Sequence, residues 1–231
     1  MLSEGVRPFR DRHEAGKRLA AGLLQFRRRP DVLVMAIPRG GVPVAYEVAK
    51  TLAVPLDVIV VRKLGLPGQP ELAMGAIASG GVRVLNRDVV HALRISDRII
   101  DSVAAQETVE LERRERMYRG ERSGVDPGGR TVILVDDGLA TGSSMQAAIA
   151  ALRARKAASV VVAVPVGPRS TCREIARLAD GVVCPNQPEF FVAVGEYYVN
   201  FDQTTDEEVR LLLERSLPDK APVAALPAGR G

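Results

Sequence analysis

The segment TVILVDDGLATGSSM, residues 131–145, sets two adjacent carboxylates at the end of an apolar run. Asp136 and Asp137 are followed by a loop of small residues that consists of Ala140, Thr141, Gly142, Ser143 and Ser144. If a helix begins there, its unpaired N–H groups and its dipole favour an anion, and the hydroxyls add donors. Carboxylates instead accept hydrogen bonds from neighbouring hydroxyl groups. The pattern therefore predicts a site for a phosphorylated sugar, although such residues alone are also typical of a turn that caps a helix.

Two further segments carry residues of the same chemical kind. Pro38, Arg39, Gly40 and Gly41 also follow an apolar run, and taken alone they are typical of a tight turn with a solvated arginine. Arg62 and Lys63 end another run, where they either close a strand or stabilise a departing anion beside the long glycine-rich connection that follows.

These residues need elements to position them, and the hydropathy pattern supplies strands alternating with helices. Apolar runs of strand length are 31–38, 55–63, 82–86, 128–137, 158–166 and 181–184. Helical periodicity or length marks the segments from Asp11 to Phe26, from 41 to Leu52, and at 95–118, 143–155, 169–179 and 205–217. Residues 64–81 contain five glycines and two prolines, so we expect a long mobile loop there.

Alternating strands and helices predict an α/β fold with three layers, in which helices flank a mainly parallel central sheet. We expect one domain over residues 1–217, with a small C-terminal hood at about 185–203 and a disordered tail at 218–231. In such a sheet ligands bind beyond the carboxyl ends of the strands, which is where Asp136 and the loop after it fall.

Composition narrows the class of protein only modestly. The chain has 231 residues, 46% of them hydrophobic, and a net charge of +4. Since no apolar run reaches the roughly 20 residues of a membrane span and no signal sequence is evident, we expect a cytoplasmic protein without a membrane partner. Nucleotide-binding P-loop and dinucleotide fingerprints are missing, and no basic stripe favours nucleic acid. Cys172 and Cys184 are interpreted as buried or incidental, and His13 and His91 receive no role.

The motifs together resemble those of the type I phosphoribosyltransferases. DDGLATGSS is similar to the family's signature for phosphoribosyl pyrophosphate (PRPP), and AIPRGGVPVA resembles its pyrophosphate-binding loop. VVRKLGLPGQPELAMGAI occupies the place of the flexible catalytic loop, and NQPEFFVAVGEYY resembles the hood. The similarity covers most of residues 32–200 in the expected order.

The resemblance implies a role for each matching residue. Pro38, Arg39, Gly40 and Gly41 would hold the pyrophosphate, in a loop that often contains a non-proline cis peptide. Asp136 and Asp137 would bind the ribose hydroxyls and, through water or PRPP, Mg²⁺. The loop of Ala140, Thr141, Gly142, Ser143 and Ser144 would hold the 5′-phosphate. Apart from the resemblance, Arg62 and Lys63 are candidates to stabilise the leaving pyrophosphate. Phe190, Phe191, Tyr197 and Tyr198 are typical packing aromatics, of which one, such as Phe190, could stack on the acceptor.

The implied activity is Mg²⁺-dependent transfer of the phosphoribosyl group from PRPP to a nitrogenous base, in a protein that we expect to be a homodimer. The acceptor stays open, because Ala140 stands where hypoxanthine-guanine enzymes carry an aspartate that acts as base; Glu189 and Glu196 are substitutes to consider. The alternatives are a regulator of the same fold that senses PRPP or a nucleotide without turnover, and a protein that binds or hydrolyses a sugar phosphate.

Overall fold

The structure is a computed structural model that describes residues 7–216, with the side chains of residues 70 and 71 excepted. The tail predicted at 218–231 lies outside the described residues. Among the helices of residues 7–216, none combines the length and the apolar character that crossing a bilayer requires.

A five-stranded parallel sheet forms the centre of the protein, in the order β2-β1-β6-β7-β8. Its strands are β1 (Val32–Ala36), β2 (Leu56–Val58), β6 (Thr131–Val135), β7 (Ser159–Ala163) and β8 (Gly181–Val183). Every residue of β1 and β6 is buried, which explains why both read as continuous apolar runs rather than alternating ones. The predicted parallel sheet is confirmed.

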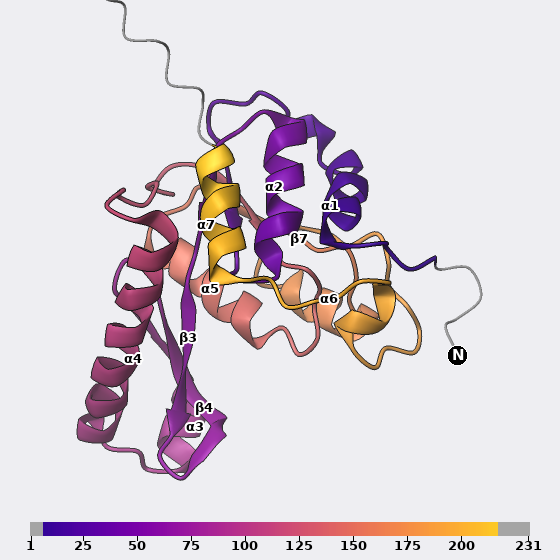
Figure 1. The fold of residues 1–231 in the computed structure, drawn as a ribbon. Helices are drawn as coiled ribbons and strands as arrows, with labels where there is room; N and C mark the ends of the chain where they lie inside the picture. The colour runs from indigo at the N-terminus through magenta and orange to yellow at the C-terminus, as the bar shows by residue number, and fades with distance from the viewer. Residues whose placement is uncertain (1–6, 217–231) are drawn as a thin grey trace, which may run out of the picture.

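Helices cover both faces of this sheet, so the three-layer architecture is confirmed as well (Figure 1). Val32, Val34 and Ala36 of β1 face α1 (Arg12–Ala21), α2 (Gly41–Leu52) and α7 (Asp206–Arg215). Leu33 and Met35 face the opposite way, toward α5 (Ser143–Ala154) and α6 (Arg169–Ile175). Alternate side chains of one strand thus enter two separate hydrophobic cores. Asp11 caps α1, as predicted, by accepting a hydrogen bond from the Glu14 N–H at 2.8 Å.

A second sheet corrects two expectations. Strands β3 (Val61–Leu66), β4 (Gln69–Ala78) and β5 (Val82–Leu85) form a separate antiparallel sheet, so residues 64–81 are not a long loop. Residues 55–63 are likewise not one strand, since the chain leaves the main sheet after Ile59, whose N–H donates to the Ala36 carbonyl. In Figure 1 this sheet lies beside α3 (Arg87–Ala92) and the long α4 (Asp97–Arg119), away from α1 and α2.

The predicted hood region, 185–203, is largely irregular and contains one short 3-10 helix, η2 (Val194–Tyr197). It meets the start of the described chain through backbone hydrogen bonds. Phe9 donates to the Tyr197 carbonyl at 2.8 Å, and Val199 donates to the Phe9 carbonyl at 2.8 Å. This pairing places the region beside the N-terminus of α1. A second 3-10 helix, η1 (Leu24–Phe26), follows α1.

Candidate active site

The two predicted binding segments follow neighbouring strands of the central sheet. Residues 38–41 follow β1, and the acid pair follows β6; the last residues of these strands, Ala36 and Val135, are partners in the parallel register. From β1 the chain continues outward to β2, whereas β6 lies on the other side of β1 and leads to β7 and β8. The strand order therefore reverses between β1 and β6. In doubly wound sheets ligands bind at such a reversal, beyond the carboxyl ends of the strands.

At this reversal the two glycines of the first segment lie against the two carboxylates of the second. A Cβ at Gly40 would overlap the Oδ2 atom of Asp137. At Gly41 it would lie 2.8 Å from the carbonyl oxygen of Val135 and 2.9 Å from Cα of Asp136, both of them main-chain atoms. Neither glycine has the left-handed backbone conformation, so it is this close approach that excludes a side chain. The peptide bond between Pro38 and Arg39 is cis, as the resemblance implied.

The loop after the acid pair leads into α5. Gly142 adopts a left-handed conformation (φ 74°) and precedes the helix, and its side-chain-free position supplies no capping group. The N–H of Ser143 has only a long contact, 3.5 Å, to Oγ1 of Thr141, and the two hydroxyls of this pair lie 3.1 Å apart. Thr141, Ser143 and Ser144 are exposed. The first turn of α5 therefore presents donors to solvent, as an anion-binding loop must.

The acid pair is electrostatically unusual. Burial raises the pKa of Asp136 well above the ordinary carboxyl range, and the neighbouring Asp137 carboxylate adds to that shift. Burial also raises the pKa of Asp137, while Arg12 acts in the opposite direction. Oδ1 of Asp136 accepts a hydrogen bond from the Asp137 N–H at 2.9 Å. Donors or a cation arriving with a ligand would stabilise the ionised form of Asp136.

Arg12 is a residue of this site that the sequence analysis missed. Its Nε atom lies 2.8 Å from Oδ2 of Asp137, and the two side chains are only 11% and 15% exposed. The same guanidinium donates to the Asp202 carbonyl at 2.7 Å and stacks over the Phe201 ring at 3.9 Å. The Tyr198 hydroxyl donates to the Asp137 carbonyl at 2.6 Å. α1 and the hood region thus jointly hold Asp137, and no local sequence pattern links residues so far apart.

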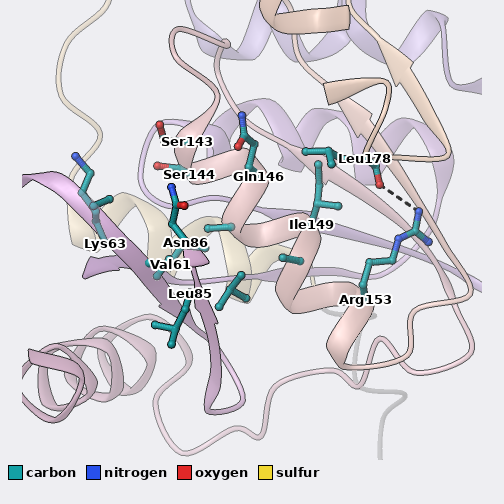
Figure 2. A pocket seen from close by; sticks show the side chains of 16 residues that line it. Val61, Lys63, Leu85, Asn86, Ser143, Ser144, Gln146, Ile149, Arg153 and Leu178 are labelled. Atoms are coloured by element: carbon teal, nitrogen blue, oxygen red, sulfur yellow. Dashed lines mark hydrogen bonds between the residues drawn. The ribbon is translucent and has the colours of Figure 1, made fainter. Parts of the chain in front are cut away.

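The predicted basic residues are distributed over three places. The Arg39 side chain, 32% exposed, lies 3.6 Å from the Asp206 carboxylate at the start of α7. Arg62 forms an ion pair with Glu107 of α4 at 2.6 Å. Lys63, its neighbour on β3, instead lines a cavity of 520 Å³ between the antiparallel sheet and α5, consistent with adjacent strand residues facing opposite sides (Figure 2).

The same cavity joins Lys63 to the predicted phosphate loop. Ser143 and Ser144 line it near the lysine, while Arg153 and Leu178 lie at its far end, where Arg153 donates to the Leu178 carbonyl at 3.4 Å (Figure 2). The structure therefore brings together Lys63 with the loop, and residues 38–41 with the acid pair. It does not bring Arg62 to this cavity.

Some aromatic residues of the hood region are buried, whereas Phe190 and the two candidate acids are exposed. Tyr197 and Tyr198 are buried and pack as core residues, and Tyr197 stacks on Phe191 with ring centres 5.7 Å apart. Phe190 is 78% exposed, so its predicted stacking on an acceptor stays a prediction. Glu189 and Glu196 are also exposed. Cys172 and Cys184 are buried free thiols.

Carboxylate oxygens are hard ligands that suit Mg²⁺, so Asp136 and Asp137 fit a role beside that ion. Within residues 7–216, no three Asp, Glu, His or Cys side chains gather closely enough to hold a metal by themselves. Mg²⁺ commonly binds through one or two carboxylates together with substrate phosphates. The donor set therefore fits an ion that arrives with a phosphorylated ligand.

The fold and the site define an α/β protein with a candidate phosphosugar site at the reversal of its strand order. Residues 11–202 match the phosphoribosyl transferase domain, and this chain belongs to that family. It is 48% identical over 220 residues to the Mycobacterium tuberculosis H37Rv protein named "Putative phosphoribosyl transferase Rv0571c". That alignment covers 95% of this chain and 49% of the relative, so the chain spans about half the length of the curated relatives it matches.

Comparison with a solved structure also confirms the fold. The crystal structure of the protein TT1426 from Thermus thermophilus has 42% sequence identity and a TM-score of 0.81. The superposition covers 91% of this chain and 100% of that one.

Proposed function

We propose that this protein transfers the 5-phosphoribosyl group of PRPP to a nitrogenous base and releases pyrophosphate, with Mg²⁺. The observation that supports this most strongly is the contact between Gly40 and Gly41 and the acid pair. Four residues from two distant segments meet at the strand-order reversal, where the carboxylates offer acceptors for hydroxyl groups beside the glycine backbone.

In this proposal each group has a separate task. The backbone of residues 40–41 and the Arg39 guanidinium hold the pyrophosphate, and the loop 140–144 holds the 5′-phosphate. Asp136 and Asp137 accept hydrogen bonds from the ribose hydroxyls, which fixes C1 relative to the incoming base. Bound Mg²⁺ supplies positive charge to the leaving pyrophosphate. Lys63, on β3 near the phosphate loop, adds positive charge at the 5′-phosphate end of the site.

The decisive experiment is a screen of purine, pyrimidine and related bases with PRPP and Mg²⁺, read by pyrophosphate release. The control is the double variant Asp136→Asn, Asp137→Asn, which keeps the shape of the pair and removes its charge. We expect release that depends on one class of base and falls at least 100-fold in the control. Equal release by both proteins with every base would refute the proposal.

A regulator of the same fold is a second candidate, and Ala140 favours it. Ala140 stands where hypoxanthine-guanine enzymes carry an aspartate that acts as base, and the substitutes considered, Glu189 and Glu196, are both exposed. A regulator would bind PRPP or a nucleotide at this site and release no pyrophosphate with any base. Calorimetric titration with PRPP, run beside the activity screen, separates the two: binding without turnover supports the regulator, and base-dependent turnover excludes it.

A further inference from the structure

A second cavity, at the opposite end of α5 from the predicted phosphate loop, is rich in arginine. It has a volume of 380 Å³ and is lined by Gly80, Glu115, Arg116, Arg119, Gly120, Arg122, Ser123, Gly124 and Arg155. Four of these nine residues are arginines and one is a carboxylate. Arg155 follows the C-terminal end of α5, whose 12 residues begin at the predicted phosphate loop. At 1.5 Å per residue the two sites are separated by about 18 Å of helix.

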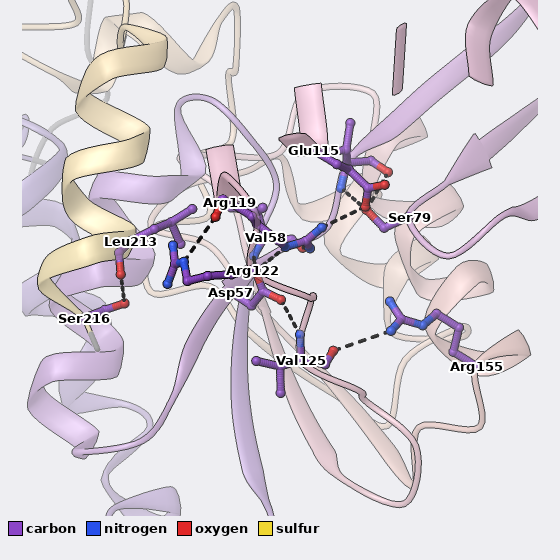
Figure 3. A network of polar contacts seen from close by, with 11 residues as sticks. Asp57, Val58, Ser79, Glu115, Arg119, Arg122, Val125, Arg155, Leu213 and Ser216 are labelled. Atoms are coloured by element: carbon purple, nitrogen blue, oxygen red, sulfur yellow. Dashed lines mark hydrogen bonds and ion pairs between the residues drawn. The ribbon is translucent and has the colours of Figure 1, made fainter. Parts of the chain in front are cut away.

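One arginine of this set, Arg119, has a structural role in the wall of the cavity. The Arg119 side chain is 8% exposed and is held by Asp57 and Glu115, both at 2.8 Å, and by the Val58 carbonyl (Figure 3). Asp57 also accepts a hydrogen bond from the Val125 N–H at 2.7 Å, which fixes the end of the loop 120–125. The charge of Arg119 is therefore compensated within the protein, and its role is structural.

Arg155 has no such compensation at close range. Its side chain is only 20% exposed, yet its contacts are a 3.5 Å hydrogen bond to the Val125 carbonyl (Figure 3) and a 4.0 Å approach to the 84% exposed Asp126. A guanidinium that loses most of its water normally gains close, charge-assisted partners. The backbone of Gly80 packs on it, since a Cβ there would lie 3.3 Å from its Cδ and Nε atoms. The glycine keeps the cavity open at this side chain.

The other two arginines stand at the rim. Arg122 lies in the loop 120–125 and is exposed, and its Nε donates to the Arg119 carbonyl at 3.2 Å (Figure 3). Arg116 is 71% exposed and approaches Glu112 only to 4.0 Å. With Glu115 already bound to Arg119, the cavity concentrates positive charge at Arg116, Arg122 and Arg155. Like charges gathered in one concave, half-buried space favour a multivalent counter-ion.

We propose that this cavity binds the phosphate chain of a condensed phosphate, whether a free polyphosphate or the di- or triphosphate of a nucleotide. Planar guanidinium groups bind phosphate oxygens in pairs, and the volume lies within the usual range of roughly 300–1,000 Å³ for small-molecule sites. The lining contains no aromatic side chain, so recognition rests on the phosphates. A nucleic-acid backbone would instead need an extended basic surface. The inference does not depend on the proposed transferase activity.

The test is calorimetric titration of the full chain with inorganic tripolyphosphate and, separately, with ATP, at 150 mM NaCl. The cavity variant is Arg122→Gln, Arg155→Gln. Its matched control, Arg113→Gln, Arg210→Gln, removes the same charge from two helix positions outside the cavity, of which Arg113 is exposed like Arg122 and Arg210 is half-buried like Arg155. Ser143→Glu adds a carboxylate to the predicted phosphate loop and so suppresses any binding there. Circular dichroism checks that each variant is folded, and Arg122→Gln alone, at an exposed position, guards against a misfolded double variant.

We expect wild type and Ser143→Glu to bind tripolyphosphate with the same affinity. The affinity should fall at least tenfold in the cavity variant and at least threefold in Arg122→Gln. In the control it should stay within twofold of wild type. Equal affinities of the two phosphates would point to the chain itself, and markedly tighter ATP binding to a nucleotide. Unchanged affinity in the cavity variant, or an equal loss in the control, would overturn the proposal. Absence of binding by both probes, or displacement of them only by single-stranded RNA, would overturn it too.

Discussion

Replacement of Gly41 by alanine tests the geometry on which the candidate active site depends. The added Cβ would lie 2.8 Å from the Val135 carbonyl oxygen and 2.9 Å from Cα of Asp136, where favourable contacts need about 3.5–4.0 Å. Both are main-chain atoms, and the Val135 carbonyl also accepts a hydrogen bond from the Ile37 N–H at 2.9 Å. No side-chain rotation can relieve the overlap, so the loop must move away from β6.

Two effects with opposite signs bear on the result. Gly41 is the first residue of α2, and helix propensity alone favours alanine over glycine by up to about 1 kcal/mol. Overpacking a rigid site costs about 1–3 kcal/mol. Because the clash is with backbone, we expect packing to dominate. After the helix term is subtracted the net cost is up to about 3 kcal/mol, so the Tm of Gly41→Ala should fall by up to about 12 °C, at roughly 2–4 °C per kcal/mol for a chain of this size. If the proposed function is correct, PRPP affinity falls with it.

Gly181→Ala is the matched control for this measurement. At that position in β8 the nearest atoms to an added Cβ belong to Val161, at 3.7 and 3.8 Å, which is ordinary contact. Its Tm should be unchanged or slightly raised, since alanine restricts the unfolded chain. Differential scanning calorimetry on both variants decides the matter: a Gly41→Ala protein as stable as Gly181→Ala would mean that the loop does not lie against β6 as described.

Three other predictions concern the acid pair and its supports. Arg12→Ala should lower the free energy of unfolding by about 3–5 kcal/mol in urea titration, because it leaves Asp137 buried without its partner. Arg10→Ala, whose own ion pair is exposed, should lose under about 1 kcal/mol. Equal losses would contradict the burial argument. The raised pKa of Asp136 means that the folded state holds this proton more tightly than the unfolded state does, so stability is greatest below the ordinary carboxyl pKa and declines as pH rises through the raised value. Asp136→Asn should flatten that decline in Tm measured from pH 4 to 9. Parallel curves of Tm against pH for wild type and variant would contradict the argument. Tyr198→Phe should cost about 0.5–1.5 kcal/mol in urea titration by deleting the hydrogen bond to the Asp137 carbonyl, and a more stable variant would show that this bond adds nothing.

The sequence pattern predicted the central sheet well, because buried parallel strands appear as short runs of valine, isoleucine and leucine. It failed where the chain changes sheets. Residues 58–61 are all valine or isoleucine, and no change of residue type marks the step after Ile59 from one sheet to the next. The glycines of residues 64–81 also misled the prediction. Gly75 is not there for mobility, since a Cβ would overlap the Val84 carbonyl, and so it permits two strands to approach closely.

The candidate site was predictable to the extent that its residues are contiguous in sequence. Residues 38–41 and 136–144 each form a local motif, and their meeting follows from the positions of their strands in the sheet. Arg12 had no such motif, because its partner Asp137 lies 125 positions away in the sequence. The difference in direction between Arg62 and Lys63 was likewise hidden, since it depends on which helix covers each face of the small sheet.

The hydrogen bonds between Phe9 and residues 197 and 199 also have a consequence for biosynthesis. They join positions about 190 residues apart in the chain, so a ribosome adding roughly 5–20 residues per second needs on the order of 10–40 s to make the second partner after the first. During that interval the ring of Phe9, 1% exposed in the finished protein, lacks its eventual cover. The hydrogen bonds from Tyr198 to the Asp137 carbonyl and from Arg12 to the Asp202 carbonyl must therefore form late, after most of the central sheet has been translated.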